Sequence, residues 1–229
     1  DNNQTGEPFV FGSRGTSSTF TEYMRISDLG NLGIGTAAPS AKLSVAGTIS
    51  GATWTASGRY GSALSFDGIN DWVTVNDSNI LDLTTAMTLE AWVYPTATLS
   101  NWRTIIAKEG VSPVLPYFLH ASSQPSSLPA TGVTIGGTEY SLKGGTRPAN
   151  NVWTHLAATY DGAFQRLYVN GIQIASQART GSMTATANPL RIGGNNIWGE
   201  YFAGRVDEIR IYNRALTQPE IQTDMNTAL

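Results

Sequence analysis

The clearest structural signal in the sequence is the stretch Leu167-Tyr168-Val169-Asn170-Gly171-Ile172-Gln173-Ile174. The Asn170-Gly171 pair supplies both positive-φ residues of a type I′ turn, the turn that joins two antiparallel strands most tightly. We therefore expect Val169 to pair with Ile172 and Leu167 with Ile174, with all four side chains on one face. The stretch predicts a β-hairpin with one side in a core.

Further strands are predicted on both sides of this hairpin, from short apolar runs bounded by Gly, Asn, Asp and Pro. The runs are 64–66, 72–75, 87–94, 103–107, 153–160 and 206–212. Within 87–94, Leu89, Ala91 and Val93 share one face, which is typical of a strand with a buried side. The Ser- and Pro-rich stretch 112–127 is interpreted as a long loop or interrupted edge, and 219–225 as a closing helical turn or two. The chain is expected to be all-β.

The net charge, the cysteine content and the length of the apolar runs exclude several classes of function. The net charge is −3 with 14% charged residues, so there is no basic surface to attract nucleic acid or an anionic membrane. The absence of cysteine excludes disulfides, cysteine-ligated zinc and thiol chemistry. No apolar run has the length of a membrane span. Nucleic acid and membrane are therefore not expected as partners.

The first 48 residues differ in character from the rest. They hold few apolar residues, and in Asn31-Leu32-Gly33-Ile34-Gly35-Thr36 glycines alternate with apolar side chains, which lets another backbone approach closely. So short a segment can hardly bury a core alone. The run from Met24 through this motif to Lys42-Leu43-Ser44-Val45 resembles a stalk motif of phage tail fibres and large bacterial surface proteins. This resemblance implies a homotrimer formed through residues 1–48.

Residues 49–229 resemble the laminin G-like branch of the concanavalin A-like lectin/glucanase jelly rolls. The resemblance is carried, in the family's order, by these phrases: Gly61-Ser62-Ala63-Leu64-Ser65-Phe66-Asp67-Gly68, Leu89-Glu90-Ala91-Trp92-Val93, Trp153-Thr154-His155, Tyr160-Asp161-Gly162, Leu167-Tyr168-Val169-Asn170-Gly171 and Gly204-Arg205-Val206-Asp207-Glu208-Ile209-Arg210-Ile211-Tyr212. It implies an antiparallel two-sheet jelly-roll sandwich, with the segment 1–48 as a short β-rich extension. It also implies a frequent structural calcium and roles in glycan binding, adhesion or enzyme accessory duty.

A calcium site is predicted at Asp67, Asn70 and Asp207. Asp207 has the strand parity of Ile209 and Ile211, so its carboxylate is expected to point into the sandwich, where it needs a partner. The turn 67–71 offers several oxygen ligands of the kind that Ca²⁺ prefers. In the family that the chain resembles, the aspartates at the positions of Asp67 and Asp207 are the usual calcium partners. The alternative is that Asp67 and Asn70 only form the turn and Asp207 bonds to backbone amides or to an arginine.

A glycan-binding surface is predicted in the loops, because sugars bind aromatic faces and planar polar groups at the end of a rigid sandwich. The candidate residues are Asn195, Asn196, Trp198 and Tyr201 in one loop, and Trp102 in another. The alternative is that Trp198 and Tyr201 cap the core while the asparagines make turns. Trp72, Trp92 and Trp153 are assigned to packing.

Catalysis is not expected. Retaining glycosidases of this fold need two carboxylates about 5 Å apart, as residues i and i+2 of a strand provide, and no strand here has such a pair. The predicted function is therefore an extracellular carbohydrate-binding or adhesion module on a bacterial surface, secreted or phage virion protein. A purely structural or trimerising spacer, and a glycoside hydrolase or lyase of the same fold, stay as alternatives.

Overall fold

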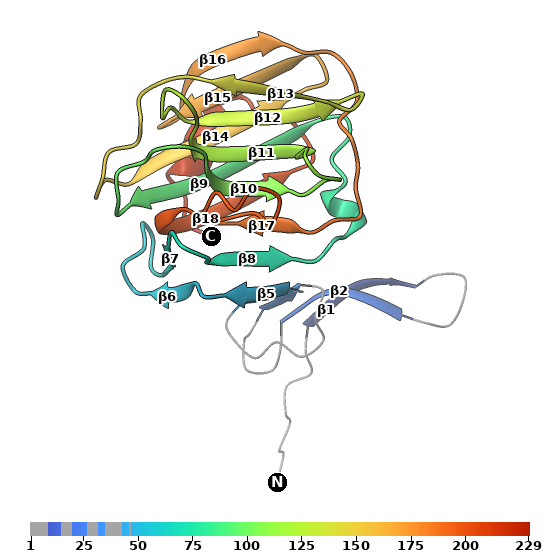
Figure 1. The fold of residues 1–229 in the computed structure, drawn as a ribbon. Coiled ribbons are helices and arrows are strands. Elements are labelled where there is room, and N and C mark those ends of the chain that lie inside the picture. The colour runs from blue at the N-terminus through green and yellow to red at the C-terminus, as the bar shows by residue number, and fades with distance from the viewer. Residues whose placement is uncertain (1–8, 15–19, 27–31, 35–42, 46) are drawn as a thin grey trace. The chain divides into compact units, whose positions relative to one another are not determined.

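The computed structural model describes residues 9–14, 20–26, 32–34, 43–45 and 47–229 (Figure 1). The chain divides into two units, residues 1–48 and 49–229. In the first unit, four strands form a sheet in the order β1-β2-β3-β4: β1 (Phe9–Arg14), β2 (Phe20–Ile26), β3 (Leu32–Ile34) and β4 (Leu43–Val45). Strands β3 and β4 pair in parallel. The predicted stalk motif is thus partly in strands, while residues 27–31 and 35–42 lie outside the described residues.

Two seven-stranded sheets make up the rest. The first, called the β10 sheet, has the order β13-β12-β11-β10-β17-β8-β5. Its strands are β5 (Gly47–Ser50), β8 (Trp72–Val75), β10 (Arg103–Lys108), β11 (Tyr117–Ser122), β12 (Ala130–Ile135), β13 (Thr138–Lys143) and β17 (Leu190–Ile192). The second, called the β9 sheet, has the order β16-β15-β14-β9-β18-β7-β6. Its strands are β6 (Thr53–Thr55), β7 (Ala63–Asp67), β9 (Met87–Pro95), β14 (Thr154–Tyr160), β15 (Phe164–Val169), β16 (Ile172–Ala178) and β18 (Ala203–Tyr212).

The two sheets lie one over the other (Figure 1) and bury one large apolar core between them. Strand β9 shows why: Leu89, Ala91 and Val93 are fully buried on the inner face, as their alternation predicted. A short 3₁₀ helix (η1, Asn79–Leu81) and one α-helix (α1, Gln218–Met225) complete the unit. The predicted all-β antiparallel sandwich is confirmed. In the described part of the chain, no helix has the length and apolar character that crossing a membrane demands.

The hairpin of β15 and β16 forms, with one correction. Asn170 and Gly171 have φ of 50° and 72°, and Val169 pairs with Ile172, as expected. A β-bulge between Leu167 and Tyr168 then shifts the register, so Leu167 pairs with Ala175 and not with Ile174. Ile172 is 60% exposed, so the predicted buried face does not reach the turn.

The interpretation of 112–127 as loop or edge was wrong. It contains β11, a central strand whose six residues are all buried. The error has a simple cause: Ser and Pro stand at both ends of the stretch, whereas Tyr117-Phe118-Leu119 in its middle is apolar. Ser and Pro can mark the two ends of a strand as well as a loop.

A second β-bulge, in β18, determines the direction in which Asp207 points. Asp207 pairs with Trp92 but Arg210 pairs with Glu90, and Glu208 between them has φ of 51°. Because the bulge adds a residue, Asp207 faces outward with Trp92, whereas Ile209 packs against the core. The prediction that Asp207 points into the sandwich was therefore wrong.

Candidate functional site

The candidate site lies on the outer face of the β10 sheet, the face that points away from the apolar core. Thr74, Arg191, Ala107 and Phe118 follow one another across four neighbouring strands in register. Over this face folds the loop Asn195–Tyr201, called the aromatic loop from here on. Sheet and loop together place aromatic, amide and charged groups on one surface.

The aromatic loop is a tight, hydrogen-bonded turn. Asn195 N donates to Gly199 O at 2.8 Å, and Gly199 N donates back to Asn195 O at 2.9 Å. Trp198 sits at its tip with 58% of its surface exposed. The Tyr201 ring lies so close to Gly194 that a Cβ there would come within 2.7 Å of it, so this position has no room for a side chain. A rigid backbone thus presents a tryptophan to solvent.

A buried polar network holds this loop to the sheet. Asn195 is fully buried, and its Nδ2 donates to Thr104 Oγ1 and to Glu200 Oε2, both at 2.8 Å. Its Oδ1 accepts from Trp198 N at 2.7 Å, so the same amide fixes the backbone at the tip. His120 Nε2 lies 3.2 Å from Thr104 Oγ1 and 3.6 Å from Glu200 Oε2. Asn195 therefore positions the exposed indole instead of facing a ligand itself.

Burial sets the protonation of this network. Burial lowers the pKa of His120 to about 3, so the imidazole is neutral at physiological pH. Burial also raises the pKa of Glu200, partly offset by its hydrogen bonds from Asn195 and Thr104. The backbone of Glu200 adopts φ of 53°, a conformation rare outside glycine. The network is a packed polar support beneath the loop.

A second group of side chains borders the loop on the β8 side. Trp72 stacks on Tyr201 with ring centroids 5.7 Å apart, and the Arg191 guanidinium lies 5.0 Å from the Trp72 ring centroid. Glu109 Oε1 accepts from Asn196 N at 2.6 Å and forms an ion pair with Arg191, whose Nε lies 3.1 Å away. Trp72 packs, as its assignment expected, but its half-buried ring does so on this outer surface against Tyr201.

Trp102 lies on the same face. Its ring meets Phe118 and His120 edge-on, at centroid distances of 6.2 and 5.4 Å, and Lys143 Nζ lies 4.5 Å from its ring centroid. Trp102 and Ile197 of the aromatic loop pack against one small apolar cluster. The structure thus brings together four predicted ligand residues of the loop and Trp102, with Trp198 and Asn196 exposed and Asn195 buried.

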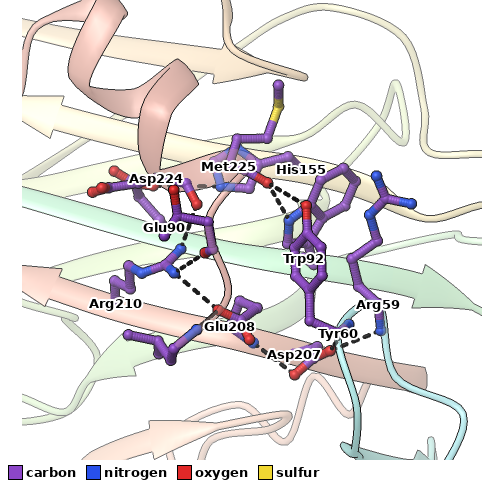
Figure 2. Close-up of polar contacts among 12 residues, drawn as sticks. Arg59, Tyr60, Glu90, Trp92, His155, Asp207, Glu208, Arg210, Asp224 and Met225 are labelled. Atoms are coloured by element: carbon purple, nitrogen blue, oxygen red, sulfur yellow. Dashed lines mark hydrogen bonds and ion pairs between the residues drawn. The ribbon is translucent and has the colours of Figure 1, made fainter.

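The structure does not bring the three predicted calcium ligands together. Asp67 pairs with Ala203 in the β7–β18 ladder, and Ala203 lies four residues before Asp207 on β18. Four residues of an extended strand span about 13 Å, whereas two oxygen atoms that bind one calcium ion lie within about 5 Å of each other. Asp207 Oδ2 accepts from Arg59 N at 2.7 Å and Tyr60 N at 3.0 Å, as Figure 2 shows. Asp207 thus has backbone donors where the calcium hypothesis expected an ion.

In the turn 67–71, two carboxylate oxygens accept no hydrogen bond from the described residues. Asp67 Oδ1 accepts from Ile69 N at 2.7 Å, and Asp71 Oδ2 accepts from Asp67 N at 2.8 Å. The second oxygen of each carboxylate has no hydrogen-bond partner among the described residues, and a hollow is lined by both residues and Asn70. No cluster of three or more His, Asp or Glu suited to a metal occurs in the described part of the chain. The predicted set of Asp67, Asn70 and Asp207 does not fit one ion.

The outer face of the β9 sheet holds a buried pair that the sequence reading missed. Glu90 Oε2 and His155 Nε2 are 3.4 Å apart, and both side chains are fully buried. Figure 2 shows them under the C-terminal segment, where Trp92 Nε1 donates to Met225 O at 3.2 Å. Cross-strand pairing of Glu90 with Ala157 and Trp92 with His155 creates the contact, so a correct β9–β14 alignment could have found it.

Comparison with known proteins agrees with this architecture. A model described as the concanavalin A-like lectin/glucanases superfamily, laminin G type, matches residues 67–222. Pappalysin-1 of Mus musculus is 38% identical over 80 residues, which are 33% of this chain and 5% of that protein. The chain therefore spans only a small fraction of the curated relatives that it matches.

Solved structures share the fold at low sequence identity. Domain 4 of AbnA, a GH43 extracellular arabinanase from Geobacillus stearothermophilus in complex with arabinotriose, has a TM-score of 0.64 at 21% identity, covering 78% of this chain and 87% of that one. The binding domain of Paraclostridial Mosquitocidal Protein 1 has a TM-score of 0.63 at 16% identity, covering 78% and 46%. The CBM40 of Ruminococcus gnavus IT-sialidase bound to α2,3-sialyllactose has a TM-score of 0.51 at 14% identity, covering 62% and 84%.

The matched region covers most of the unit formed by the two seven-stranded sheets. The chain belongs to the laminin G-like family of the concanavalin A-like lectin/glucanase superfamily.

Proposed function

We propose that residues 49–229 are a non-catalytic, extracellular carbohydrate-binding module whose ligand lies on the aromatic loop. One observation carries this proposal: Trp198 is 58% exposed, yet its backbone is fixed by a fully buried amide. An exposed indole on a preorganised loop loses little entropy on binding and offers a flat face for the C–H side of a sugar. Asn196 beside it supplies an amide that can pair with hydroxyl groups.

The structural neighbours support the same proposal. Two of them are described as complexes with arabinotriose and α2,3-sialyllactose, and another is the binding domain of Paraclostridial Mosquitocidal Protein 1. Since the fold hosts many functions, the proposal depends on the surface of this chain and not on the neighbours alone. Arg191 on β17 is already paired with Glu109, whereas Lys143 Nζ lies 4.5 Å from the Trp102 ring centroid on the same face, so the array should carry both neutral and acidic glycans.

The test is a glycan array followed by calorimetric titration of any hit. Trp198→Ala should weaken binding by about 30-fold, the cost of losing a central aromatic contact. Trp54→Ala is the matched control, because Trp54 on β6 is 56% exposed and belongs to the other sheet. Equal loss in both variants, or an array without any binding, would contradict the proposal. Release of reducing ends from a polysaccharide panel would show an enzyme instead.

We also propose that residues 1–48 form a trimeric stalk of the tail-fibre type. The support is the glycine-alternating motif together with a separate unit that has its own sheet. Light scattering should give three times the chain mass, and deletion of residues 1–48 should give a monomer. A monomeric full chain would contradict the stalk.

A further inference from the structure

Residues 224–229, called the strap from here on, lie over the outer face of the β9 sheet (Figure 2). Side chains of that face and of the loop before β7 hold the strap chiefly by its main chain. The donors to strap carbonyls are Trp92 Nε1 and Tyr60 Oη, both 3.2 Å from Met225 O, and Arg210, which donates to Asp224 O at 2.9 Å and to Thr227 O. These contacts fix the position of the strap with little dependence on its side chains.

The side chains of the strap contribute little burial. Residues 226–229 are exposed, with Leu229 82% exposed, whereas Ile221 one turn earlier in α1 is fully buried. The last turn of α1, which the structure describes completely, carries no basic residue to stabilise its free carbonyl groups. A segment with few buried apolar contacts opens at a small fraction of the free energy of global unfolding. The strap can therefore open while Ile221 keeps the rest of the helix in place.

The pair beneath the strap is poorly satisfied. Glu90 Oε2 and His155 Nε2 are 3.4 Å apart, but the contact is not aligned as a hydrogen bond. Both oxygens of Glu90 and both ring nitrogens of His155 lack a hydrogen-bond partner within the part of the chain that the structure describes. Buried polar groups normally have such partners, because leaving them unpaired is costly. Water that enters when the strap opens would supply them.

Ionisable groups surround this pair on every packed element. They are His155 on β14, Tyr168 on β15, Glu208, Arg210 and Tyr212 on β18, Asp224 on α1 and Arg59 in the loop before β7. Burial raises the pKa of Glu90, the contact with His155 opposes this rise, Asp224 adds to it and Arg210 opposes it. Arg210 compensates Glu90 only weakly, because its guanidinium pairs with Glu208 at 2.9 Å and donates to the strap carbonyls. The uncharged acid therefore fits the closed site, whereas the carboxylate needs water.

We propose that residues 224–229 are a pH-gated strap, which is closed in acid and opens as pH rises, and whose opening exposes Glu90, His155 and Trp92 to solvent. Protonated Glu90 is uncharged and its O–H can donate to His155 Nε2, so it is stable under the strap. Ionised Glu90 is stabilised by water, which reaches it in the open form. Because one proton is involved, each pH unit above the pKa of Glu90 in the closed form shifts the opening equilibrium by up to about tenfold. The strap concerns the β9 sheet and does not depend on glycan binding on the β10 sheet.

The experiment is amide hydrogen exchange of the full 229-residue chain between about pH 5 and pH 8, with each rate divided by that of an unstructured peptide at the same pH. Protection of the Thr227 and Leu229 amides, which donate to Asp224 O and Glu208 Oε2, should fall by up to about tenfold per pH unit. It should stay far below the protection of β9 amides and should not respond to low urea, because a local opening exposes little surface. Glu90→Gln should give a flat profile. Glu208→Gln is the matched control, which should lower protection at every pH and keep the slope.

Three results would overturn the proposal. A flat wild-type profile would show that no titrating group gates the strap, whether or not the variants fold. Strap amides that exchange as slowly as those of β9 would show global unfolding instead of a local opening. A slope that persists in Glu90→Gln would assign the titration to another group, which is Glu208 if the slope disappears in Glu208→Gln. The Trp92 indole N–H gives a second readout, because opening breaks its bond to Met225 O: its NMR resonance should move with the same pH dependence, and a resonance that stays fixed would contradict the opening.

Discussion

Replacing Asp207 by alanine should destabilise the laminin G-like unit by several kcal/mol, with or without calcium. The Asp207 carboxylate accepts from Arg59 N at 2.7 Å, Tyr60 N at 3.0 Å and Glu208 N at 2.9 Å. A hydrogen bond to a charged group contributes about 1.5–3 kcal/mol, and a buried donor without a partner adds a cost. Since water can reach the exposed Arg59, the three terms do not add fully, and we expect a total of ~3–5 kcal/mol.

Urea denaturation of wild type and Asp207→Ala, each with calcium and with chelator, measures this effect. Asp161→Ala is the control: Asp161 also accepts from two backbone amides, at Ala163 and Phe164, but in an exposed turn, so it should cost about 1 kcal/mol. Amide hydrogen exchange should accelerate at Arg59 and Tyr60 in Asp207→Ala only. A loss below about 1 kcal/mol, or one that appears only with calcium, would refute the amide anchor.

Two further predictions concern the turn and the buried pair. The calcium prediction now depends on the turn 67–71: calcium should raise the melting temperature of wild type and Asp207→Asn but not of Asp67→Asn, and no response in wild type would exclude the ion. Burial raises the pKa of Glu90 above its ordinary value of 4.5, with the His155 contact opposing this shift. The stability that this shift provides is complete below pH 4.5 and is lost as pH rises through the raised pKa. Urea denaturation across pH 4 to 8 should show this decline in wild type and not in Glu90→Gln, whereas parallel profiles would contradict it.

Much of the fold could be predicted from the sequence because short apolar runs bounded by turn residues mark most of the strands. Leu89, Ala91 and Val93 occupy the inner face as expected, and Asn170-Gly171 makes the predicted turn. Bulges were not predictable, because an extra residue in a strand depends on contacts with the partner strand. The bulge at Glu208 reversed the direction of Asp207 and thereby removed it from the predicted calcium site.

The candidate site could be predicted only in part, because the contacts that support it join residues far apart in the sequence. The composition of Asn195–Tyr201 identified the loop, but not that Asn195 would support Trp198 from below. That role depends on Thr104 and Glu200, which the sequence places 96 residues apart. Trp72 was assigned to packing because it lies in a strand, and its parity, opposite to that of the buried Val73, could have placed that packing on the outer face.

The most direct test of the binding proposal is to observe the six tryptophan indole N–H resonances by NMR while a glycan identified on the array is added. The account predicts the largest shifts at Trp198, a smaller one at Trp72, and no change at Trp54. Binding that shifts Trp54 and leaves Trp198 unchanged would place the ligand elsewhere and contradict the account.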